Sequence, residues 1–165
     1  MTGPSRPVKR PTGLLPRRRG LWRRRPCLRR IIRRPGRQRL QLGQVTDHTA
    51  ALWRDLPGNL MPPAAPDDQR LSSTAHWDVP VLTDAGPLHL LAWSATPPVF
   101  DGPEDLNGRR NHDEAAFWLH HLPRAPFVLL GNPNLDIVDG EGRAQAMTAL
   151  LDHAQDPQPR GTFQP

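Results

Sequence analysis

The residues best suited to chemistry stand directly after a short apolar run in the last third of the chain. Phe127 to Leu130 is apolar without alternation, which favours a short strand buried on both faces. Gly131 ends the run, and Asn132, Pro133 and Asn134 then place two side-chain amides on a stiff turn. Because a buried strand delivers the residues that follow it to the rim of a core, the sequence predicts a strand end that presents amide groups.

Three carboxylates, Asp136, Asp139 and Glu141, follow these amides in a loop that contains glycine. Their spacing does not meet that of an EF-hand calcium loop, and acidic residues ahead of a helix are favoured by the helix dipole alone. Apolar positions between Arg143 and Ala154 predict that helix. From the residues alone, no metal ligand is assigned.

Two strands are expected to lie beside this strand end. Asp78–Leu82 and Leu88–Trp93 are strand-like segments joined by turn-forming residues, which predicts a hairpin. His76 precedes the first of them and is a candidate catalytic residue, because histidine is the usual acid-base group near neutral pH. A hydrogen-bonded structural role is the commoner alternative for a histidine at such a place.

A helix is predicted to begin at Asn111, which can cap it while Glu114 stands three residues on, as in a capping box. One apolar stripe then follows at helical spacing, made of Ala115, Trp118, Leu119 and Leu122. The loop before it, residues 96–110, contains paired acids and paired arginines. An exposed loop of mixed charge is favoured there over a phosphate or metal pocket.

Four stretches of the chain resemble consecutive segments of bacterial members of the endonuclease/exonuclease/phosphatase superfamily, which has the DNase I-like fold. They are WRDLPGNLM from Trp53, LSSTAHWDVPV from Leu71, TPPVFDGPEDLNGRRNHDE from Thr96 and NLDIVDGEGR from Asn134. In addition, GNPN from Gly131 is similar to the GD-x-N signature of that family. The resemblance begins near Leu52 and extends to the C-terminus.

This resemblance implies an α/β (α+β) fold over residues 51–165, as a fragment of the DNase I-like two-sheet β-sandwich flanked by helices. The early Asn and Glu and the late Asp-His pair of the family have no match, so we expect a partial domain. An apolar face of such a fragment is expected to stay uncovered, which predicts marginal stability or aggregation.

The implied activity is Mg²⁺-dependent hydrolysis of a phosphodiester, with nucleic acid as one candidate substrate. Asn134 would orient the substrate phosphate, whereas Asn132 and Ser94 occupy positions at which the family has Asp and His. An amide lacks the charge and the proton acceptor of a carboxylate, so metal affinity and general-base chemistry should both fall. We therefore expect a hydrolase that is weakly active or inactive.

Charge divides the chain into two parts. Residues 1–40 hold 15 of the 22 Lys and Arg residues and no acid, which leaves 7 basic and 16 acidic residues in the remainder, a net charge of −9. Residues 1–50 are predicted to be a disordered Arg/Pro-rich segment, and residues 41–68 a linker and irregular loop. The alternative function is a non-catalytic protein that binds nucleic acid through this arm. An out-of-frame reading of a GC-rich gene would also produce such a composition.

Other function classes find little support in the sequence. The basic segment lacks the apolar core of a secretory signal, and no stretch is long and apolar enough to predict a membrane span. Cys27 is the single cysteine, so no internal disulfide can form. Compartment, oligomeric state and substrate identity stay open at this stage.

Overall fold

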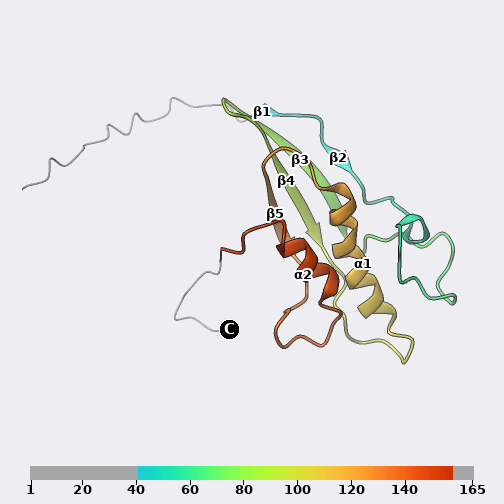
Figure 1. The fold of residues 1–165 in the computed structure, drawn as a ribbon. Coiled ribbons are helices and arrows are strands. Elements are labelled where there is room, and N and C mark those ends of the chain that lie inside the picture. The colour runs from blue at the N-terminus through green and yellow to red at the C-terminus, as the bar shows by residue number, and fades with distance from the viewer. Residues whose placement is uncertain (1–40, 158–165) are drawn as a thin grey trace, which may run out of the picture. The chain divides into compact units, whose positions relative to one another are not determined.

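The computed structural model describes residues 41–157, which form one five-stranded sheet and two α-helices (Figure 1). The strands are β1 (Gln41–Leu42), β2 (Thr46–Asp47), β3 (Ala75–Thr83), β4 (Gly86–Ser94) and β5 (Phe127–Asn132). The helices are α1 (Leu106–His121), α2 (Gln145–Leu151) and a short 3-10 helix, η1 (Trp53–Asp55). The mixed α/β class, of the α+β type, is confirmed at this level. In the described part of the chain, no helix is long and apolar enough to cross a membrane.

β3 and β4 form the predicted antiparallel hairpin, in register from Ala75 opposite Ser94 to Thr83 opposite Gly86. The Thr83 hydroxyl donates to the Gly86 carbonyl at 2.6 Å and accepts from the Ala85 amide at 3.2 Å, which closes the turn. Gly86 has a φ of 112°, a conformation that favours glycine. The hairpin prediction is confirmed, and both strands extend beyond the predicted bounds.

β5 lies parallel to β4, and the chain crosses from one to the other through α1. The helix begins at Leu106, so the prediction that Asn111 caps it is wrong. Asn111 and Glu114 lie inside the helix and are 1% and 0% exposed. Residues three apart share a helix face, so the spacing of a capping box is also the spacing of two buried polar residues on one face.

Both helices cover the same face of the sheet (Figure 1), and the core lies between this face and the helices. Trp53 and Trp118 are fully buried in this core, and burial of each side chain stabilises the fold by roughly 2–3 kcal/mol. Of the predicted helix stripe, Ala115 and Trp118 are buried, and Leu119 and Leu122 are partly buried. The remaining buried members of the core are Leu56, Leu71, Leu91, Trp93, Ala95, Phe117, Ala146 and Leu150.

The prediction that β5 is buried on both faces is wrong. Phe127 and Leu129 pack against the core, but Val128 and Leu130 are 44% and 39% exposed. Their side chains lie on the face of the sheet opposite the helices, since neighbouring residues of a strand point to opposite faces. An uncovered apolar face was expected of a partial domain, and the described residues contain one.

The prediction that residues 41–50 belong to a linker is also wrong. β1 and β2 both pair with β3, with Leu42 opposite Val81 and Asp47 opposite Trp77. Each strand has only two residues, too few for an alternating pattern, so their pairing depends on β3 and not on a local signal. The predicted disorder of residues 1–40 lies outside the described residues. α2 is shorter than the predicted helix from Arg143 to Ala154.

Candidate functional site

The ends of β4 and β5 bring together three of the four candidate residues. Ser94 is the register partner of Asn132 in the parallel β4–β5 pair, and Asn134 follows on the turn. The Ala95 amide donates to the Asn132 carbonyl at 2.9 Å, so the two chains stay joined beyond the last strand residues. Two segments nearly 40 positions apart in the sequence therefore meet at one strand end.

The two asparagines of this strand end hold each other in place. Asn132 Nδ2 donates to Asn134 Oδ1 at 2.8 Å, and the Asn134 backbone amide donates to Asn132 Oδ1 at 2.9 Å. Asn134 Nδ2 donates to the Ala95 carbonyl at 2.6 Å, and the residue has a φ of 49°, a region in which Asn is well tolerated. Each side-chain amide carries two N–H groups, so a second N–H of each remains for a ligand.

The Asn111 side chain of α1 holds the turn after β5 by a hydrogen bond. Its Nδ2 donates to the Thr96 carbonyl at 2.7 Å and to the Pro133 carbonyl at 2.8 Å. One buried side chain thus ties the loop after β4 to the loop after β5. The position of Asn134 relative to Ser94 depends on this contact, because Pro133 immediately precedes Asn134.

Glu114 lies one helical turn further along α1 and is fully buried. Its carboxylate accepts hydrogen bonds from the backbone amides of Ser73 at 2.6 Å and Thr96 at 2.5 Å. Burial raises the pKa of this carboxyl, while the two amide donors act in the opposite direction. Glu114 therefore fixes the entry to β3 and the exit from β4, and both carboxylate oxygens are occupied by these contacts.

The fourth candidate, His76, does not join the strand-end residues. Its side chain lies under α1 and is 1% exposed, with Nδ1 2.9 Å from the Ser72 hydroxyl and Nε2 3.0 Å from the Glu114 carbonyl. Burial lowers its pKa to about 4. Both ring nitrogens have partners and solvent does not reach the ring, so the geometry favours the structural alternative over the catalytic one.

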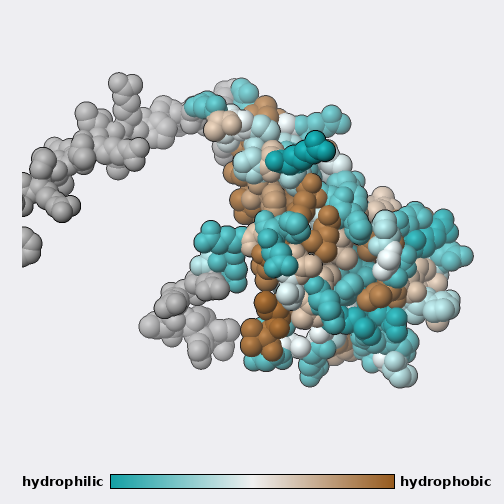
Figure 2. All heavy atoms as spheres, viewed as in Figure 1, coloured by the Kyte–Doolittle hydropathy of each residue, from teal (hydrophilic) through white to brown (hydrophobic). Residues whose placement is uncertain are grey.

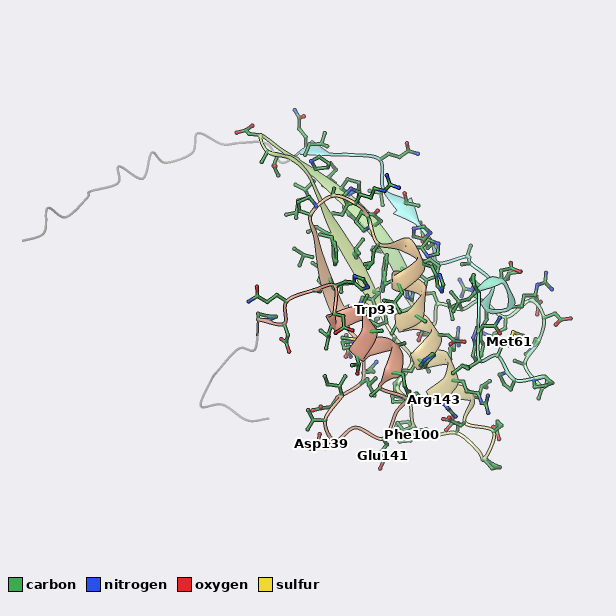
Figure 3. The ribbon with its side chains drawn as sticks, in the orientation of Figure 1. Met61, Trp93, Phe100, Asp139, Glu141 and Arg143 are labelled. Carbon is green, nitrogen blue, oxygen red and sulfur yellow. The ribbon has the colours of Figure 1, made fainter. Side chains whose placement is uncertain are left out.

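The loops after β4 and β5 lie together at the same end of the molecule, where Figure 3 labels Phe100, Asp139, Glu141 and Arg143. Arg143 forms an ion pair with Asp105 at 2.6 Å, which joins the second loop to the start of α1. Phe100 and Asp105 both have positive φ values, 65° and 52°, and Phe100 is 95% exposed. The charge of the Arg143 guanidinium is therefore balanced by its carboxylate partner, Asp105.

The donor groups at this end do not fit Mg²⁺. This ion prefers carboxylate oxygens in octahedral geometry, whereas the strand end offers the amides of Asn132 and Asn134 and the hydroxyl of Ser94. Among residues 41–157, no three His, Cys, Asp or Glu side chains lie close enough to hold a metal ion. The arrangement can donate hydrogen bonds to an anion, but it supplies no metal ligand set.

A separate groove of about 1060 Å³ runs beside the first half of β5. Apolar side chains from the strand and from α2 line much of it, including Phe127, Leu129, Met147 and Leu151. Ser94, Asn132 and Asn134 are not part of this lining. The groove therefore offers apolar contact area next to an edge strand and is distinct from the strand-end site.

Two residues that position the site were assigned other roles in the sequence. Asn111 and Glu114 were interpreted as a helix cap, although both are buried and bond to the loops around the strand end. Asp113 between them is also buried, and it accepts hydrogen bonds from the Trp53 indole and the Leu60 amide, both at 2.6 Å. The sequence did contain a signal for buried polar residues. Asn111, Asp113 and Glu114 fall within four positions of a helix that also carries an apolar stripe.

Comparisons of the chain with protein-family models, with curated proteins and with solved structures found no match.

Proposed function

We propose that the chain is a partial domain of the endonuclease/exonuclease/phosphatase type that binds a phosphodiester at the β4–β5 strand end and is impaired in Mg²⁺-dependent hydrolysis. The observation that supports this most directly is the meeting of Ser94, Asn132 and Asn134 at one strand end. The resemblance assigns phosphate contacts to these three positions, and they come from segments far apart in the sequence.

The chemistry available at this strand end is neutral hydrogen-bond donation. The second N–H of Asn132, the second N–H of Asn134 and the Ser94 hydroxyl are the donors for non-bridging phosphate oxygens. A neutral hydrogen bond contributes about 1 kcal/mol net, so three of them give a dissociation constant in the millimolar range or weaker. Hydrolysis needs a general base and a metal ligand set, which Asn132 and Ser94 do not provide.

A titration with bis(p-nitrophenyl) phosphate, followed by ¹⁵N-detected NMR, tests the binding. The side-chain amide signals of Asn132 and Asn134 should shift with increasing ligand, and Asn134→Ala should weaken binding several-fold. Asn59→Ala is the matched control, because the Asn59 side chain donates to the carbonyls of Arg54 in η1 and of Leu56 directly after it, and not to the strand end. Shifts confined to other residues, or equal binding by the Asn134 variant, would refute the assignment.

The impairment is tested by restoring the two side chains that the resemblance expects. The double variant Asn132→Asp with Ser94→His should release p-nitrophenolate from the same ligand faster than the parent, in a manner that depends on Mg²⁺. The parent chain, measured with and without Mg²⁺, is the reference. A double variant no faster than the parent would mean that these two positions do not limit hydrolysis.

A second candidate function is nucleic-acid binding by the basic segment. Its support is compositional: residues 1–40 hold 15 cationic side chains and no acid, beside a remainder that is acidic. Binding of single-stranded DNA should weaken steeply as salt increases and disappear when residues 1–40 are deleted. Binding that is insensitive to salt, or that survives the deletion, would count against this function.

A further inference from the structure

The face of the sheet opposite the helices carries rows of apolar side chains that run across its strands. The register places Trp77 beside Ala92 and Leu130, and Val79 beside Leu90 and Val128. A third row is made of Val81, Leu88 and Leu42. We call this surface the open face, and its apolar members are Leu42, Ala75, Trp77, Val79, Val81, Leu88, Leu90, Ala92, Val128 and Leu130.

None of the open-face residues belongs to the core that packs against α1 and α2. Four of them are well exposed, with Leu42 at 59%, Trp77 at 46%, Val128 at 44% and Leu130 at 39%, whereas Val81 is 8% exposed. Figure 2 shows brown, apolar residues gathered along the β5 side of the sheet. No helix or strand of residues 41–157 covers this face, so a contiguous apolar surface is available for a partner.

We propose that the open face is a dimer interface, on which a second copy of this chain packs sheet against sheet. The charge pattern of the face supports this partner. Asp47 is the single ionisable residue that the register of β1 to β5 places on the face, and it lies at the edge beside Trp77. Two open faces related by a two-fold axis therefore meet without burying a charged residue at their centre.

The size of the open face also suits a self-limiting dimer. With strands about 4.8 Å apart and residues rising about 3.3 Å each, three rows across four strands cover roughly 400 Å². Aligned sheets stack about 10 Å apart at an angle near −30°, which brings most of such a face into contact. Two such faces together cover roughly 800 Å², which is below the roughly 1,200 Å² of stable interfaces and in the range of weak ones, so we expect a weak dimer that forms as the concentration increases.

The basic segment of the same chain is a poorer occupant of this face. Its apolar residues are interrupted by clusters of arginine, for example between Trp22 and Ile31. Covering the open face with this segment would desolvate guanidinium groups for which the face offers no carboxylate partner, apart from Asp47 at its edge. A second copy meets the face with matching uncharged side chains. Ser94 and Asn132 continue the row of Ala75 at the end of the same face, so we expect the dimer and phosphodiester binding to compete, and the dimer is measured without ligand.

The test is the mass of the full 165-residue chain in solution, measured by sedimentation velocity between 1 and 200 µM. The parent should shift with concentration toward twice the chain mass of 18.5 kDa. Leu90→Lys, at the centre of the open face, should stay monomeric over this range. Val138→Lys is the matched control, because Val138 is an apolar residue that is 87% exposed but lies on the loop after β5. This control variant should dimerise like the parent.

A second measurement, the rate of intermolecular disulfide formation, tests the interface even if Leu90→Lys does not fold. In a Cys27→Ser background, Leu90→Cys should form an intermolecular disulfide on mild oxidation at least ten-fold faster than Val138→Cys. Equal rates, or a parent that stays monomeric at 200 µM, would overturn the proposal. Polydisperse aggregates would overturn it as well, since the interface would not be self-limiting. A dimer that appears only after residues 1–40 are deleted would show that the basic segment covers the face instead.

Discussion

Replacement of Asn111 by alanine is the sharpest test of how the strand end is held together. Asn111 is 1% exposed and donates from one nitrogen to the carbonyls of Thr96 and Pro133. The variant removes both hydrogen bonds and leaves two carbonyl groups without this donor. It also leaves a small void next to α1. We expect the variant to lose stability and to release the turn that contains Asn134.

The size of the effect follows from these contacts. Each lost hydrogen bond contributes about 1 kcal/mol net, and each acceptor left without a partner in a buried place costs roughly 1–3 kcal/mol. The Pro133 carbonyl is only partly buried and can bind water, so the full penalty applies to Thr96 alone. The variant should therefore lose about 2–4 kcal/mol. A change of 1 kcal/mol shifts the melting temperature of a domain of this size by about 4 °C.

Thermal unfolding followed by circular dichroism measures this loss, with His120→Ala as the control because His120 is an exposed residue of the same helix. The Asn111 variant should melt roughly 8–15 °C below the parent, and the control should melt within about 2 °C of it. At a temperature where the variant is still folded, its binding of bis(p-nitrophenyl) phosphate should be weaker than that of the parent. An Asn111 variant with unchanged melting and unchanged binding would refute the idea that α1 positions the strand end.

Three further predictions follow from single contacts. The His76 ring signals in NMR should stay at their neutral positions from pH 7 to pH 5, because burial lowers the pKa to about 4; titration of the ring above pH 6 would contradict the buried placement. As the pH falls, the unfolded state binds a proton on His76 before the folded state does, because the pKa is lower in the folded state. The contribution of His76 to stability, about 3 kcal/mol, is therefore complete above pH 6.5 and is lost as the pH falls toward 4. The raised pKa of Glu114 acts in the opposite direction and stabilises the folded state as the pH falls. Gly131→Ala should abolish soluble folded protein, because a Cβ would lie 1.7 Å from the Trp93 carbonyl oxygen at a φ of 133°. Gly58→Ala, which also has a positive φ of 70° but meets no neighbouring atom, should stay folded with a loss of about 1–2 kcal/mol. Arg143→Ala should change the unfolding free energy in urea by less than about 1 kcal/mol, because its ion pair with Asp105 is partly exposed; a larger loss would show that the pair holds the two loops together.

The sequence predicted the elements whose signals are local. The hairpin of β3 and β4 was predictable because turn residues separate two strand-like segments, and β5 because an apolar run ends on glycine. The start of α1 was not predictable, because the spacing of Asn111 and Glu114 fits a helix cap as well as a buried helix face. β1 and β2 escaped prediction because two-residue strands depend on a partner elsewhere in the chain.

The candidate site shows the same division between local and non-local information. Asn132 and Asn134 could be placed at a strand end from the residues around them, but nothing near Ser94 indicates that it lies beside Asn132. The register of β4 and β5 shows that placement. His76 was open to two interpretations because exposure decides between them, and exposure depends on α1, which is distant in the sequence.

The chemistry of the strand end is separable from the contacts that build it. The side chains to which the proposal assigns a ligand, those of Asn132 and Ser94, lie at the ends of their strands and are not part of the core. The side chains that fix the two loops, those of Asn111 and Glu114, are buried in α1 and have no access to a ligand. We therefore expect substitutions at Asn132 and Ser94 to leave the fold intact, because the groups that determine the shape of the strand end differ from the groups proposed to act there.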